Sequence, residues 1–153
     1  MSGFKQSCLD AHNRYRSRNG VTLLKWSGKL TKDAQYWANH LAASGKWEHD
    51  PTARGKDQGE NLYHYFNYPT SLSCEEMVKE WYAEEANYDY KTGEAKEQYA
   101  QIYHFTQIVW KTTKKLGMAT AVSGGRTVAV ARYSPFRNWL GEFKENVLPP
   151  KKV

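Results

Sequence analysis

Two histidines and two glutamates are the side chains in this sequence best suited to do chemistry together: His49, Glu60, Glu84 and His104. Imidazole nitrogens and carboxylate oxygens both ligate zinc, and such a set leaves a coordination position open for water. The same groups also form structural clusters of hydrogen-bonded acids and bases. None of the four falls in the compact HExxH spacing, and single histidines are more often structural than metal-bound, so spacing alone favours the structural cluster.

His104 opens the segment HFTQIVW, residues 104–110, in which Phe105, Ile108 and Val109 recur at helical spacing. The positive end of a helix dipole disfavours a protonated imidazole, so electrostatics within the helix do not explain a histidine at this position. We therefore expect another group in the fold to require a neutral imidazole there.

The two glutamates raise a similar question. Glu84 falls at helical spacing between Trp81 and Tyr88, so its carboxylate stands on an otherwise aromatic face and needs a partner. Glu60 shares one face of a candidate strand with His64, which would bring a fifth polar group near the other four. Both carboxylates are therefore expected to find polar partners in the folded chain.

Hydrophobic periodicity and capping residues predict four helices that would position these side chains. The first is expected in residues 3–20, with Ser2 as N-cap and Gly20 as the stop, and the second in residues 26–46, with Thr31 as N-cap and Gly45 as the stop. The third opens with the capping box of Ser73 and Glu76 and runs through Tyr82. The fourth is expected in residues 104–115. The long stretch of residues 87–103 has no clean period and is expected to be a loop.

Strand signals are confined to two places. Residues 116–134 form two β-rich runs joined at Gly124-Gly125, which predicts a β-hairpin, and residues 60–66 predict a shorter strand. The double proline near the end should keep residues 143–153 extended and non-helical. Helices first and last around a small antiparallel sheet indicate an α+β fold.

Length and charge limit the class of protein. The chain has 153 residues and no linker-like stretch, which indicates one domain, and its formal net charge is +6. This excess favours anionic partners such as acidic membrane surfaces. The basic residues are scattered, apart from the run Lys111–Lys115 and the C-terminal tail, and no nucleic-acid-binding motif is present, so we expect no nucleic acid partner.

Cysteine use bears on the compartment. Cys8 and Cys74 are the two cysteines, too few for a disulfide framework in a secreted domain of this size, so the sequence favours a reduced, intracellular chain. A secreted protein would instead pair them in a single intramolecular bond. No stretch is long and apolar enough to span a bilayer, and the first residues lack the apolar core of a signal peptide.

Four motifs occur in order along nearly the whole chain. They are AHNRYR at residues 11–16, GENLY at residues 59–63, HFTQIVW at residues 104–110 and RYSPFRNW at residues 132–139. Together they resemble the signature motifs of the CAP superfamily, which comprises cysteine-rich secretory proteins, antigen 5 and plant pathogenesis-related proteins. The stretches VWKTTKKLGM, VARYSPFRNW and ENVLPPKK are similar to its Golgi-associated plant pathogenesis-related subgroup.

The resemblance implies a fold and a site. The fold would be a single CAP domain over residues 1–153, a three-layer α-β-α sandwich with a central antiparallel sheet and residues 143–153 as an extended C-terminal segment. His49, Glu60, Glu84 and His104 would meet in a central cleft, where His49 and His104 would bind zinc. The polar motif residues Asn13, Arg16, Asn61 and Asn138 are expected to fix loops and helix ends instead.

For function, the resemblance implies a non-enzymatic binding protein on the cytoplasmic face of Golgi or endosomal membranes. Its expected partners are acidic phospholipid surfaces, a sterol-like ligand, a second copy of the chain and a protein partner. Because the chain begins Met1-Ser2-Gly3 and not Met-Gly, the acceptor site for N-myristoylation is lost, so charge and aromatic residues would have to provide membrane attachment. Two alternatives are a zinc-dependent hydrolase, with Glu60 or Glu84 as general base, and an extracellular defence or venom-like protein.

Overall fold

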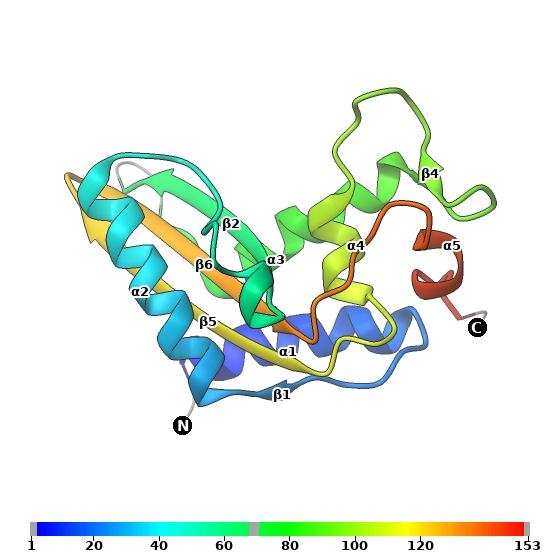
Figure 1. Cartoon of the computed structure of the whole chain (residues 1–153), viewed down its shortest axis with the longest axis horizontal. Coiled ribbons are helices and arrows are strands. Elements are labelled where there is room, and N and C mark those ends of the chain that lie inside the picture. The colour runs from blue at the N-terminus through cyan, green and yellow to red at the C-terminus, as the bar shows by residue number, and fades with distance from the viewer. Residues whose placement is uncertain (1–2, 68–70, 152–153) are drawn as a thin grey trace.

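The computed structural model describes residues 3–67 and 71–151. Its helices are α1 (Phe4–Arg18), α2 (Gly28–Ser44), α3 (Cys74–Tyr82), α4 (Tyr103–Val109) and α5 (Phe143–Asn146), with short 3-10 helices at Arg54–Lys56 and Ala83–Asn87. Its strands are β1 (Lys25–Trp26), β2 (Gly59–Phe66), β3 (Tyr88–Asp89), β4 (Glu94–Ala95), β5 (Lys115–Ser123) and β6 (Arg126–Ser134). Figure 1 shows these elements along the chain.

The helix ends largely follow the predicted signals. Ser73 and Glu76 form the predicted capping box of α3, and Gly45 ends α2 in a left-handed conformation with φ of 74°. The cap of α2 differs, because the Ser27 hydroxyl accepts a hydrogen bond from the Leu30 N–H and Thr31 lies inside the helix. The predicted cap of the first helix, Ser2, lies outside the described residues.

A four-stranded sheet in the order β1-β5-β6-β2 forms the middle of the molecule. Three strands are antiparallel as predicted, with β5 and β6 joined at Gly124 and Gly125, both of which have positive φ. The two-residue β1 adds a parallel edge strand, which the sequence did not predict, so the sheet is mixed. Its pairing places Lys25 opposite Lys115.

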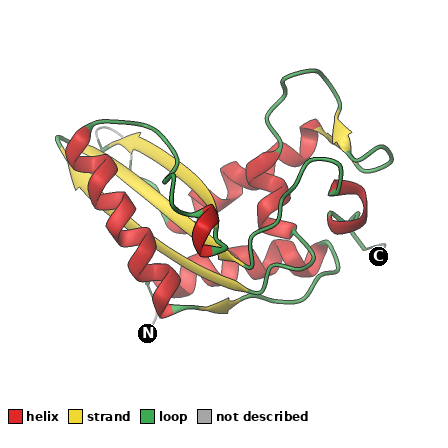
Figure 2. Cartoon of the chain, viewed as in Figure 1, coloured by secondary structure: helices red, strands yellow, loops and turns green. Residues whose placement is uncertain are grey.

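Helices cover both faces of this sheet, which confirms the three-layer sandwich (Figure 2). On one face α2 packs through Ala34, Ala38 and Leu41 on Val128 and Val130 of β6. On the other face, the larger core gathers buried residues of α1, α3 and α4. Helix α2 lies so close to β5 that a Cβ on Gly117 would approach the Thr31 backbone nitrogen to 2.2 Å, so only glycine fits there.

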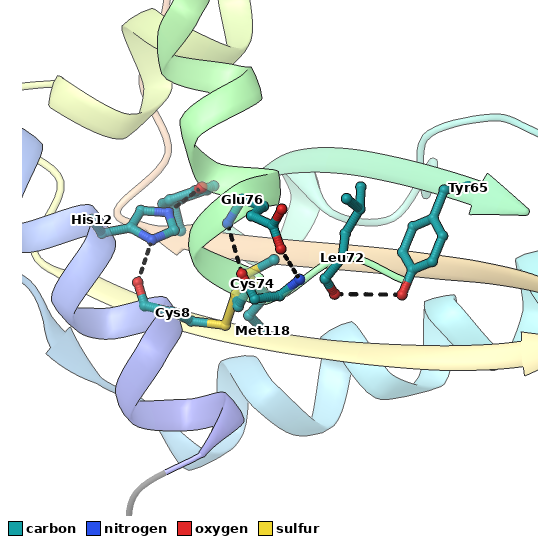
Figure 3. The surroundings of a disulfide bond; sticks show 9 residues. Cys8, His12, Tyr65, Leu72, Cys74, Glu76 and Met118 are labelled. Carbon is teal, nitrogen blue, oxygen red and sulfur yellow. Dashed lines mark hydrogen bonds between the residues drawn. A yellow bond between two sulfur atoms is a disulfide. The ribbon is translucent and has the colours of Figure 1, made fainter. Parts of the chain in front are cut away.

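A disulfide joins α1 to α3 within the larger core (Figure 3). It links Cys8 to Cys74 with 5.2 Å between their Cα atoms, and the Met118 sulfur of β5 lies 3.5 Å from the Cys74 sulfur. The prediction of two reduced thiols was therefore wrong. A pair of cysteines 66 residues apart gives no local signal of pairing, because the packing of α1 against α3 brings them together.

Three segments differ from the predicted elements. Helix α4 ends at Val109, because residues 110–114 turn into β5. The stretch predicted as a loop at residues 87–103 carries the small β3–β4 pair. The segment predicted to stay non-helical contains α5, whose buried Phe143 packs on Trp110 at a ring distance of 5.7 Å, so tertiary packing holds four residues helical ahead of the prolines.

Candidate functional site

A cleft of about 480 Å³ opens where the start of β2, the start of α4 and the segment after β6 come together. His49, Glu60 and His104 all line it, so three of the four predicted residues share one cavity. Phe136 and Leu140 supply an apolar wall, and the remaining lining is mostly polar.

The mouth of the cleft carries a His49–Glu60 pair. His49 Nδ1–H donates to Glu60 Oε1 at 2.7 Å, and the Asp50 backbone N–H donates to the same oxygen at 3.0 Å. The His49 side chain remains 66% exposed while that of Glu60 is 4% exposed. The carboxylate therefore orients an imidazole whose Nε2 has access to solvent.

A second pair joins His104, which lines the cleft, to Glu84, which is not among the lining residues. His104 Nδ1–H donates to Glu84 Oε2 at 2.7 Å, while Glu84 Oε1 accepts the backbone N–H groups of His104 at 2.9 Å and Phe105 at 3.1 Å. Glu84 thus caps α4, and it does so from the 3-10 helix that follows α3, one element later than its spacing predicted. This carboxylate is the partner of His104 at the head of α4, but it accepts from an Nδ1–H that both forms of imidazole can carry, so it does not require the neutral ring expected there.

Buried Arg132 holds the His49–Glu60 side in place. Its guanidinium is fully buried and donates to Glu60 Oε2 at 2.8 Å, Gln58 Oε1 at 2.7 Å and Asp50 Oδ2 at 2.7 Å. Burial alone would raise the pKa of Asp50, but hydrogen bonds from Thr52 and Arg132 hold that pKa below its ordinary value. The positive charge of Arg132 thus stabilises both of these buried carboxylates.

Sequence reasoning missed Arg132, although a signal for it exists. Arg132 follows Val128 and Val130 at two-residue spacing on β6, and both valines are fully buried beneath α2. A charge on the buried face of a strand requires anionic partners elsewhere in the chain. The alternation therefore indicates a buried ion pair, without saying which carboxylates form it.

A second missed residue, His12, connects α1 to the cleft. It is fully buried, and burial, with a smaller effect of the Arg16 charge, lowers its pKa to about 4, so its ring is neutral. Its Nδ1–H donates to the Cys8 carbonyl at 2.8 Å, and its Nε2 accepts from the Tyr133 hydroxyl at 2.7 Å. Asn61 donates to that hydroxyl at 3.1 Å and to the His104 carbonyl at 3.2 Å.

The other polar motif residues make the structural contacts predicted for them, although Asn61 and Asn138 also line the cleft. Arg16 is buried and donates to backbone carbonyls at the end of α4 and beyond it, those of Ile108, Trp110 and Thr113, each at 2.9 Å. Asn13 bonds both backbone groups of Leu24, and Asn138 bonds Thr106 and the Tyr103 carbonyl in the first turn of α4. The bonds of Arg16 and Asn138 fix the helix that carries His104, whereas those of Asn13 fix the loop that leads into β1.

His64 does not join the cleft. It shares a strand face with Glu60 as predicted, but it lies at the far end of β2, where its ring stacks on Trp47 with 4.1 Å between centroids. Its Nδ1 accepts a hydrogen bond from Arg126 Nε at 3.1 Å. The expected fifth polar group is therefore a surface contact, because β2 is long enough to separate the two side chains.

The arrangement suits a metal ion in part. Both imidazoles direct Nδ1 to a carboxylate, the contact that orients a metal-ligating histidine, and so leave Nε2 as the ligand atom. Within residues 3–67 and 71–151, no group of three or more His, Cys, Asp or Glu side chains is placed to hold a metal ion. An ion here would have two imidazole ligands and take its others from water or from a bound molecule.

The chain is similar in sequence to known proteins over nearly its full length. The family model described as "CAP: Cysteine-rich secretory protein family" matches residues 9–133. Golgi-associated plant pathogenesis-related protein 1 of Homo sapiens is 38% identical, with 97% of this chain and 95% of that protein covered. Secreted protein RBT4 of Candida albicans is 36% identical, and there 97% of this chain spans 41% of the relative.

Solved structures share the fold. The crystal structure of NaASP2 with Zn2+ aligns with a TM-score of 0.73 at 19% identity, covering 97% of this chain and 86% of that one. At this sequence identity the alignment shows similarity of fold alone. Among the residues that the structure describes, no helix has the length and apolar character needed to cross a membrane.

Proposed function

Because the chain belongs to the CAP family of cysteine-rich secretory proteins, we propose that it is a non-enzymatic binding protein whose cleft takes a zinc ion between His49 and His104. One observation carries this proposal: each imidazole has its Nδ1 held by a carboxylate at 2.7 Å, which fixes the ring and leaves Nε2 for the metal. Bound zinc would supply a Lewis acid that fixes an anionic or carbonyl group of a ligand in the cleft.

The occupied carboxylates favour binding over hydrolysis. A zinc hydrolase with Glu60 or Glu84 as general base needs a carboxylate oxygen directed at the attacking water. Here Glu60 Oε1 and Oε2 accept from His49 and Arg132, and both oxygens of Glu84 accept from His104. These bonds give the glutamates an orienting role, so hydrolysis is the weaker proposal.

Calorimetric zinc titration tests the metal site. Wild-type protein should bind zinc, and the His49→Ala/His104→Ala variant should lose binding while circular dichroism shows an intact fold. The matched control is His40→Ala/His64→Ala, which removes two exposed histidines outside the cleft and should leave zinc affinity unchanged. Unchanged affinity in the folded cleft variant would reject the assignment, and absent binding in the wild type would leave the four residues a structural polar cluster.

Association with acidic phospholipid membranes is a second part of the proposal. The net charge of +6 supports it, because each basic residue near an anionic surface contributes about 1 kcal/mol of salt-sensitive attraction. A sterol-like ligand, a homodimer and a protein partner are further proposals that rest on the family resemblance.

The disulfide bears on the compartment. The relatives include a Golgi-associated protein and secreted proteins, so the family by itself is compatible with either side of the secretory membranes. Disulfides persist in oxidising compartments and are rare in the cytosol. Of the two expected locations, the Cys8–Cys74 bond supports the extracellular alternative over the cytoplasmic face of Golgi or endosomal membranes.

A further inference from the structure

Two lysines face each other at the edge of the sheet where β1 pairs with β5. Lys25 and Lys115 are register partners in this parallel pair, and the Lys25 N–H donates to the Lys114 carbonyl at 3.0 Å. The side chains of Lys25, Lys114 and Lys115 are all exposed. Like charges directly opposite on neighbouring strands destabilise a sheet, so this pairing costs stability unless an anion approaches it.

No carboxylate within the described residues compensates this charge. Lys25, Lys114 and Lys115 form no ion pair with the side chains of residues 3–67 and 71–151, whereas Lys29 and Lys56 share the acid Asp33. The three lysines thus place positive charge at one edge of the sheet, where β1 pairs with the start of β5. Figure 1 shows the backbone of these two strands. We call these three residues the lysine edge.

An exposed leucine stands beside the lysine edge on a fixed backbone. Leu23 is 58% exposed. Its neighbours are tied down, because the Thr22 carbonyl accepts from Arg16 Nε at 2.7 Å and the Leu24 N–H donates to Asn13 at 2.7 Å. The leucine therefore meets water without a local rearrangement that could hide it.

We propose that the lysine edge, with Leu23, docks on the surface of an anionic lipid bilayer. This proposal rests on the membrane association put forward above and names the surface responsible. Lysine ammonium groups act as point charges that suit a diffuse layer of headgroups, whereas a site for one phosphate would call for the planar fork of arginine. The exposed leucine favours a bilayer over a soluble polyanion, because it can enter the apolar boundary beneath the headgroups.

Sedimentation with lipid vesicles tests the surface, using the disulfide-bonded protein. Vesicles of phosphatidylcholine with phosphatidylserine are compared with phosphatidylcholine alone. The variant Lys25→Gln/Lys114→Gln/Lys115→Gln should lower partitioning roughly 100-fold, since each lysine near the surface contributes about fivefold. The matched control, Lys46→Gln/Lys79→Gln/Lys91→Gln, removes the same charge from exposed lysines on other segments and should lower partitioning less than tenfold.

The apolar part has its own variant. Leu23→Ser should weaken binding to phosphatidylserine vesicles by several-fold at every salt concentration, whereas the effect of the lysine variant should shrink as salt screens the charges. A parallel experiment with heparin in place of vesicles tests whether the same surface binds a soluble polyanion.

Four outcomes would overturn the proposal. Wild-type protein that ignores phosphatidylserine vesicles would remove membrane association itself. Vesicle binding that survives in the lysine variant would leave membrane association standing and reject this surface. Equal losses in the two lysine variants would attribute binding to net charge. Lysine-dependent binding to heparin without binding to vesicles would identify a soluble polyanion as the partner.

Discussion

The guanidinium of Arg132 is the buried charge that orients Glu60, and through Glu60 it orients His49. Replacing it with methionine would leave Asp50 and Glu60 as buried carboxylates without their cation. We expect Arg132→Met to lower the free energy of unfolding by about 3–5 kcal/mol in urea titration, the range typical for breaking a buried ion pair.

A matched arginine provides the control. Arg137 forms an exposed pair with Asp57 at 3.8 Å, so Arg137→Met should change stability by less than about 1 kcal/mol. Similar losses of stability in the two variants would show that burial does not increase the contribution of Arg132 to the free energy of unfolding.

His12 makes stability depend on pH. Its pKa of about 4 in the folded chain lies below the ordinary value of 6.5, so the unfolded chain takes up a proton that the folded chain does not. Stability should therefore fall as pH drops from about 6.5 towards 4, by about 2 kcal/mol between pH 7 and pH 5. The groups that face this ring are the Cys8 carbonyl, the Tyr133 hydroxyl and the Arg16 charge, and none is a carboxylate that would offset protonation.

Chemical denaturation across this pH range measures the effect. In His12→Leu the slope should flatten, although the variant is less stable at pH 7 because Tyr133 loses its acceptor. An unchanged slope in the variant would assign the pH dependence to other groups.

At the scale of elements, the disulfide joins two helices, each of which helps to position a residue that contacts the site. Helix α1 carries His12, and α3 leads into the 3-10 helix that carries Glu84. In the chain-entropy account, a bond that closes a loop of 66 residues restricts the unfolded chain by about 4 kcal/mol. We expect Cys8→Ala/Cys74→Ala to lower the free energy of unfolding by about this amount.

Reduction separates the bond from the substitutions. Adding a thiol reductant during unfolding should destabilise the wild type and leave the double variant unaffected, and thiol titration of unfolded wild-type protein should find no free thiol. Two titratable thiols would contradict the disulfide and would restore the intracellular interpretation.

Across the whole molecule, the sheet separates two surfaces with different chemistry. The cleft is assembled at the start of β2 from residues as far apart in sequence as His49 and Leu140. The lysine edge belongs to β1 and the start of β5. The two surfaces share no residue, so a ligand in the cleft and an anionic surface at the edge would not compete for the same side chains.

Local pattern determined the elements that depend on neighbours in sequence. The capping box at Ser73, the stop at Gly45 and the turn at Gly124-Gly125 each act within a few residues, and each is confirmed. The family resemblance implied that His49, Glu60, Glu84 and His104 meet in one cleft, and the first, second and fourth of them line the same cavity. The caps and the turn can be predicted from sequence because their energies arise from short-range hydrogen bonds and backbone conformation.

Tertiary structure alone decided the contacts between distant residues. The Cys8–Cys74 bond spans 66 positions, Arg132 meets Asp50 across 82 positions, and His12 meets Tyr133 across 121. Packing likewise made α5 helical, held Glu84 at the head of α4 and set Lys25 against Lys115. The sequence shows that such groups need partners, because buried charges and polar atoms must be satisfied, but the packing of helices on the sheet selects which partners they find.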